Sequence, residues 1–254
     1  MGFRRSVGTK WVLLLGAMMM TAGASTHNAL PSGTILPVRL NNSISSKKTK
    51  AGQTVTARIM QDVPLPDRGR VRGGTRILGH IMDVSPASAN SGARISFSFD
   101  AIEFAGRKAP ISTNLRAIAS LREIEDAQDP AWGTDRGTGP NAYTTVQVGG
   151  DVVYRGGGHV ISGHTVVGEP VANGVLVRVS NRAGEPCRTD VDGNEWLQAL
   201  WLFSSDACGA YGFPGMKIVH AGRTNPIGEI ILESPHREID IRSGSGMLLR
   251  VDRR

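Results

Sequence analysis

The chain has 254 residues, a formal net charge of +7 and two cysteines. Its basic residues are scattered, and the only dense basic run, Lys47-Lys48-Thr49-Lys50, has no aromatic neighbour. Nucleic-acid binders usually concentrate basic and aromatic residues on one element, so we expect no nucleic-acid partner.

Residues 1–24 have the pattern of a secretory signal peptide. A head with three positive charges precedes an apolar run over residues 11–21, and Ala22-Gly23-Ala24 offers small side chains to a signal peptidase. Cleavage there would lower the formal charge to +4. We expect an exported protein of the periplasm or cell envelope without a transmembrane span in the mature chain. An uncleaved amino-terminal anchor is the alternative.

Residues 25–126 are predicted to form the first part of a β-barrel-like domain. Apolar residues occupy every second position in short runs at residues 36–40, 55–59 and 95–99, as half-buried strands require. Turns rich in Gly and Pro separate these runs. The predicted fold class is all-β, a small barrel or sandwich of short antiparallel strands.

Residues 127–216 are predicted to be a long Gly-rich insertion, since glycines interrupt the strand pattern there. We predict that it contains one short helix at residues 196–203, where Trp196 and Leu200 have the i, i+4 spacing of helix neighbours. The strand pattern resumes in residues 217–254, which are predicted to supply the closing strands of the β domain.

Cys187 and Cys208 are predicted to form a disulfide, because an exported chain reaches an oxidising compartment. Closing a loop of this length stabilises a fold by about 3 kcal/mol in the chain-entropy model. The bridge would fasten the part of the chain with the weakest strand pattern.

Two short patterns contain side chains that could bind a metal ion. In the first pattern, His159 and His164 lie in a Gly-rich stretch, and neutral imidazoles suit zinc or copper. Glu169 could be the third ligand. In the second pattern, Asp190, Asp192 and Asn194 place oxygen ligands at alternate positions, as calcium-binding loops do. The alternative interpretation is a turn followed by a helix cap. We predict no cofactor. The candidate metal ligands are His159, His164, Asp190, Asp192 and Asn194.

No complete catalytic constellation is recognisable in the sequence. Ser243-Gly244-Ser245-Gly246 departs from the Gly-x-Ser-x-Gly pattern of a nucleophile elbow and precedes a predicted strand. Gly156-Gly157-Gly158 lacks the lysine of a phosphate-binding loop. The sequence therefore favours a protein that is not an enzyme.

Several tracts of the first strands resemble the β-barrel domain of the TrbI-like family. They are residues 30–40, 51–53, 56–58, 62–63 and 73–79, and residues 239–251 show a weaker echo of the pattern. The resemblance implies a β-barrel and a role as a scaffold component of type IV secretion and conjugal transfer channels. The helical hairpin that such channels use at the outer membrane is not recognisable in the insertion.

We therefore expect an exported, non-catalytic envelope protein that self-associates or binds other envelope proteins. Trp196 and Trp201 are candidate partner contacts, because aromatic residues dominate interface energetics, and core packing is the alternative for both. The alternative function is an extracellular glycan-binding module or hydrolase that uses Asp190, Asp192 and Glu195 as paired acids.

Overall fold

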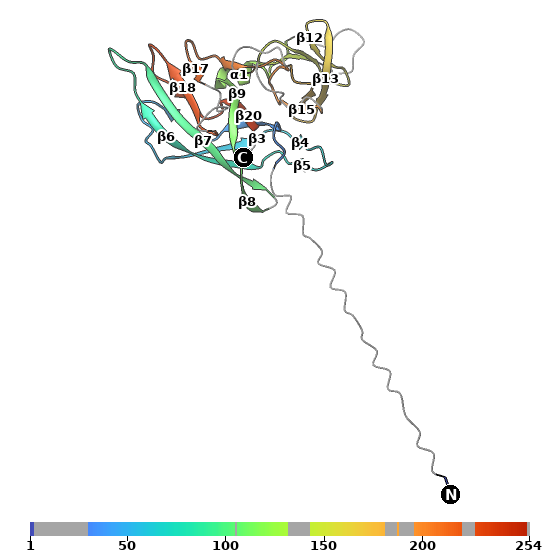
Figure 1. Ribbon diagram of the computed structural model, residues 1–254. Helices are drawn as coiled ribbons and strands as arrows, with labels where there is room; N and C mark the ends of the chain where they lie inside the picture. Colours follow the sequence, from blue (N-terminus) through green and yellow to red (C-terminus); the bar gives the residue numbers. More distant parts are fainter. Residues whose placement is uncertain are drawn as a thin grey trace.

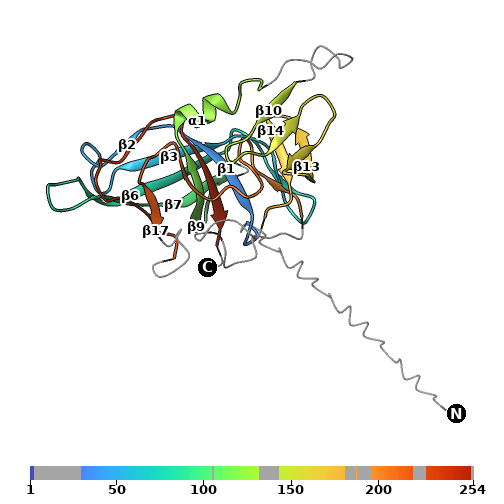
Figure 2. The same cartoon turned by 90° about the horizontal axis from the view of Figure 1, so that it is seen from above.

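The computed structural model describes residues 1–2, 30–104, 106–131, 143–180, 187, 196–219 and 227–252. Within these ranges the regular structure is almost entirely β, which confirms the predicted fold class, with the short helix α1 (Leu121–Asp126). Figures 1 and 2 show a large barrel-like sheet with a smaller sheet at one side. In this part of the chain, no helix has the length and apolar character that crossing a bilayer requires.

The larger sheet is a nearly closed barrel with the hydrogen-bonded order β16-β9-β20-β1-β3-β6-β7-β18-β17, and β8 pairs with β7. The terminal strands β16 and β17 contact each other. Of the strands in the described ranges, the first, β1, pairs along its length with the last, β20. The bounds are β1 (Ile35–Leu40), β3 (Thr54–Ile59), β6 (Arg76–Ser85), β7 (Ala93–Phe104), β8 (Arg107–Pro110), β9 (Thr113–Ala119), β16 (Gly209–Tyr211), β17 (Lys217–Val219), β18 (Ile230–Ser234) and β20 (Gly246–Val251).

Two strand pairs flank the barrel. β2 (Ile44–Ser45) pairs with β19 (Asp240–Ile241), and β4 (Val63–Pro64) pairs with β5 (Arg70–Val71). The β4–β5 hairpin follows β3 directly in the sequence. It becomes one wall of the site described below.

The alternation that predicted the strands also builds the barrel core. Leu36 and Val38 of β1 belong to this core, together with Phe97 and Phe99 of β7, whose rings meet edge to face at 5.8 Å. Alternate side chains of a strand point to opposite faces, so the residues between them face outward.

The smaller sheet is an antiparallel meander inside the predicted insertion. Its strands follow one another in sequence order, each paired with the next. Residues 209–211, also assigned to the insertion from sequence, instead form β16 of the barrel. The strands of the smaller sheet are β10 (Thr144–Val146), β11 (Val152–Tyr154), β12 (Val160–Ser162), β13 (Thr165–Val171), β14 (Gly174–Val177) and β15 (Gln198–Ala199).

The smaller sheet covers the outer face of the barrel wall formed by β9, β20 and β1. Ile35 of β1, Ala117 of β9 and Leu248 of β20 form a second core cluster with Val175 and Phe203 from the insertion. Every residue of β9 and of β20 is buried. This wall therefore has an apolar core on both faces.

The predicted helix at residues 196–203 is wrong. Gln198 and Ala199 form β15 and pair with β14, and Trp201 then takes a positive φ of 54° in a turn. Residues 198–205 are all buried, so their apolar side chains contact neighbours on every side. A surface helix is recognised in a sequence by its polar face, and this run has none. The pairing of β15 with β14 therefore determined its structure.

The predicted disulfide between Cys187 and Cys208 is present, with the Cα atoms 6.1 Å apart. Arg116 of β9, fully buried, lies beside it and donates from Nε to the carbonyl oxygen of Ala207 at 3.0 Å. A second bond runs from Arg116 Nη2 to the carbonyl oxygen of Ser180 at 3.2 Å. A buried guanidinium is tolerated when its donors are bonded, and here it ties the disulfide region to the barrel.

Candidate functional site

Two buried glutamine side chains join the smaller sheet to the barrel. Gln61, which follows β3, donates from Nε2 to the carbonyl oxygen of Val175 at 2.9 Å. Its Oε1 accepts the backbone N–H groups of Val175 and Trp201. Gln198 of β15 accepts the N–H of Ile35 in β1 at 3.1 Å. Because both amides are buried and bonded, they hold the two sheets in one arrangement.

The Gln61 amide occupies the place of a peptide group beside β14. β15 is only two residues long, and Gln61 continues the hydrogen bonding to Val175 where that strand ends. A Cβ on Gly174 would lie 2.0 Å from Gln61 Oε1, so glycine is required at this position. The local sequence is thus shaped to accept this one side chain.

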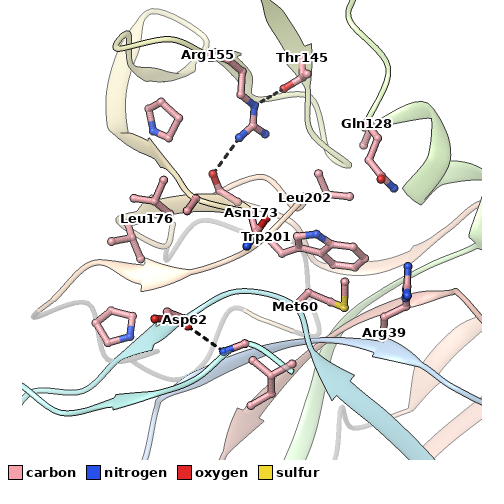
Figure 3. A pocket seen from close by; sticks show the side chains of 18 of the residues that line it. Arg39, Met60, Asp62, Gln128, Thr145, Arg155, Asn173, Leu176, Trp201 and Leu202 are labelled. Carbon is pink, nitrogen blue, oxygen red and sulfur yellow. Dashed lines mark hydrogen bonds between the residues drawn. The ribbon is translucent and has the colours of Figure 1, made fainter. Parts of the chain in front are cut away.

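A cleft of about 1350 Å³ opens between the barrel and the smaller sheet. Arg39 of β1 and Met60 line it from the barrel side, and Arg155 lines it from the opposite side (Figure 3). The β4–β5 hairpin forms a further wall, with Asp62 and Arg70 at its base. Typical small-molecule sites have volumes of about 300–1,000 Å³, so this open cleft has room for a larger ligand.

Arginines lie side by side on three neighbouring strands of the barrel, and two of them, Arg39 and Arg58, line the cleft. Arg39 of β1 lies directly opposite Arg58 of β3, which in turn lies opposite Arg76 of β6. Arg76 pairs with Glu103 at 3.5 Å. Among the described residues, neither Arg39 nor Arg58 forms a salt bridge. Like charges directly opposite each other destabilise a sheet, so the Arg39–Arg58 pair is unfavourable for the fold. Within the described residues, no acidic side chain forms a salt bridge that compensates for it.

Arg155, after β11, supplies a further positive charge from the smaller sheet. It donates from Nε to Thr145 Oγ1 at 3.3 Å and from Nη1 to the carbonyl oxygen of Gly174 at 3.0 Å (Figure 3). Partial burial lowers the pKa of the Arg155 guanidinium from its usual value, but an arginine stays protonated in proteins. Its neutral hydrogen-bond partners hold the side chain in place without cancelling its charge.

Apolar side chains cover part of the cleft between these cations. Met60, Val171 and Leu176 line it and are partly buried. Asp62 brings a negative charge, but it lies 3.4 Å from Arg70 and accepts a bond from the N–H of Gly73. The cleft therefore presents uncompensated positive charge next to apolar surface.

A second hollow, of about 510 Å³, contains Ser98, His80 and Asp100. His80 Nδ1 lies 2.8 Å from Asp100 Oδ2 and 3.3 Å from Ser98 Oγ. A catalytic triad needs the acid and the serine on different nitrogens of the histidine, so that one orients the ring while the other exchanges the proton. Here both meet the same nitrogen, and this arrangement does not activate the serine.

The two candidate contact tryptophans differ in burial. Trp201 is only 5% exposed and packs in the second core cluster, while its backbone forms part of the Gln61 junction. Trp196 is partly buried. Trp201 is therefore a core residue, which is the alternative interpretation given for both tryptophans.

The candidate metal ligands are not brought together where the structure describes them. His159 and His164 are exposed, and within the described ranges they form no group of three potential ligands with Glu169 or another His, Cys, Asp or Glu. Asp190, Asp192 and Asn194 lie outside the described residues, as does Glu195. The calcium interpretation and the acidic hydrolase site thus stay predictions from sequence.

Sequence reasoning missed the arginines of the cleft. Arg39 and Arg58 occupy outward positions in strands that were predicted correctly, but only the β1–β3 register places them opposite each other. The available signal was an outward arginine in each of two consecutive strands. The sequence does not reveal the register between the two strands, and without it this signal could not be interpreted.

Comparisons of the chain with models of known protein families, with curated proteins and with solved structures find no match. The TrbI-like resemblance therefore stays an expectation from the sequence. The site itself must carry any statement about function.

Proposed function

We propose that this protein is an exported, non-catalytic component of the cell envelope that holds a partner in the cleft between its two sheets. The observation that carries the proposal is the cleft itself, with arginines on opposite sides and a frame held by buried glutamines. Binding sites gain from such rigid surroundings, because little order has to be created when the partner arrives.

Two further features support this proposal. The disulfide between Cys187 and Cys208 suits an oxidising compartment outside the cytoplasm, where such bridges persist. A barrel with a side cleft also suits an assembly scaffold of the kind that the TrbI-like resemblance implies. The partner in this proposal is another envelope protein or a second copy of the chain.

The proposal is tested by photocrosslinking from inside the cleft. Gln128 is exposed and lines the cleft, so a benzoylphenylalanine at this position should crosslink to an envelope component in extracts. Gln53 is exposed and lies outside the cleft, which makes the same replacement there a matched control. Crosslinks from position 128 alone support the proposal, and equal labelling from both positions, or none, contradicts it.

The alternative of an extracellular hydrolase has its own test. Purified protein should be inactive on ester, peptide and glycoside substrates, while light scattering reports any self-association. Turnover that disappears when Asp190, Asp192 or Glu195 is changed to Ala, in a protein that stays folded, would replace the scaffold with the hydrolase.

A further inference from the structure

We infer that the cleft binds an acidic, extended peptide segment, whose carboxylates pair with Arg39, Arg58 and Arg155 while its apolar side chains cover Met60 and Leu176. This inference rests on the proposed function, because it names the ligand chemistry of the same cleft.

The first step is the uncompensated charge of Arg39 and Arg58. Their side chains leave neighbouring strands on one face, where opposite Cβ atoms are about 4.5–5.5 Å apart. A carboxylate between them can accept hydrogen bonds from both guanidinium groups, and each planar guanidinium can bind a carboxylate with two parallel bonds. A bound carboxylate would thus offset the electrostatic repulsion between Arg39 and Arg58, and this favours binding of an acidic ligand.

The second step is the position of Arg155 on the other side of the cleft. Its bonds to Thr145 and Gly174 fix the guanidinium, and in Figure 3 it lies across the cleft from Arg39. A ligand that meets both sides needs at least two acidic groups separated by a spacer. A single inorganic anion would fill only a small part of a cleft of about 1350 Å³.

The third step separates a peptide from an anionic polysaccharide. Met60, Val171 and Leu176 leave apolar surface next to the arginines. A peptide can place apolar side chains there and gain the free energy of burying them. A sugar hydroxyl at the same place would lose its water without finding a hydrogen-bond partner.

The test uses a fluorescein-labelled (Glu-Leu)5 peptide as the probe, with (Gln-Leu)5 as its neutral control. Fluorescence anisotropy should show binding of the acidic peptide alone, weakened by added salt because the pairing is electrostatic. The double variant Arg39→Gln/Arg58→Gln should bind at least about tenfold more weakly, since each charge-assisted contact is worth about a factor of ten. Arg107→Gln, an exposed arginine on β8 outside the cleft, should bind like the unchanged protein.

Thermal unfolding separates a ligand-binding role from a structural one. Removing two opposed positive charges should leave the melting temperature unchanged or raise it. A double variant that loses both binding and stability would assign Arg39 and Arg58 to the fold and overturn the inference. The single variant Arg58→Gln checks the same point with a smaller change.

The remaining outcomes also decide the question. Absence of peptide binding up to about 1 mM overturns the inference, since a weaker contact would not hold a partner. Binding of oligogalacturonate instead of the peptide, lost in the double variant, replaces the peptide with an anionic polysaccharide. If either of these two results is obtained, crosslinks from position 128 would still support the cleft as a binding surface. The proposed function and the inferred peptide ligand can therefore fail separately.

Discussion

Replacing Gln61 by Met removes the amide that joins the two sheets while nearly keeping the side-chain volume. Gln61 is 1% exposed, and its loss deprives the backbone N–H groups of Val175 and Trp201 of their acceptor. The carbonyl oxygen of Val175 keeps the N–H of Leu200 as a partner at 3.3 Å. Two buried donors are thus left unsatisfied, at about 1–3 kcal/mol each. We expect the free energy of unfolding to fall by about 3 kcal/mol.

Urea unfolding followed by circular dichroism measures this change, and an unchanged slope with denaturant would show that the unfolding reaction stays the same. Gln53→Met is the control, because Gln53 is exposed and its loss should cost less than about 0.5 kcal/mol. A loss below about 1 kcal/mol for Gln61→Met would refute the reasoning, since it would mean that the amide does not carry the junction.

Three further predictions concern the disulfide and two carboxylates. Cys187→Ser/Cys208→Ser should lower the free energy of unfolding by about 3 kcal/mol, while far-ultraviolet circular dichroism shows that the barrel persists. Burial, and then a neighbouring carboxylate, raises the pKa of Asp206, so its ionisation opposes folding. Asp206→Asn should therefore raise thermal stability at pH 7, and this gain should vanish below about pH 3, where the carboxyl is protonated in both states. The hydrogen bond from Ser46 lowers the pKa of Glu238, so Ser46→Ala should shift the Glu238 titration measured by NMR to higher pH.

The sequence was most informative where one face of a strand is buried and the other is polar. Residues 36–40, 55–59 and 95–99 alternate clearly, and β1, β3 and β7 include them. It failed at residues 196–203, because residues 198–203 are buried on all sides and have no periodic polar face. The pairing of β15 with β14, which local spacing does not encode, decided that segment.

The cleft could not be predicted for a different reason. Its charge depends on the β1–β3 register, which places Arg39 opposite Arg58. Its shape depends on Gln61, a polar residue between two short strands that looks like any exposed loop residue in the sequence. Both features join residues through tertiary contacts, and a single sequence carries no record of such contacts.

The pairing of β1 with β20 also determines when this chain can fold. Ile35 lies opposite Arg250, so the barrel can close only after the chain as far as Arg250 is available. Contacts between such distant residues slow folding, because a long loop must be ordered before any pairing compensates for it. Until β20 arrives, β1 keeps an open edge and apolar side chains on both faces, which favours aggregation. If the chain is exported, as proposed above, it would fold after translocation, and its folding yield would depend on how well that edge is protected until then.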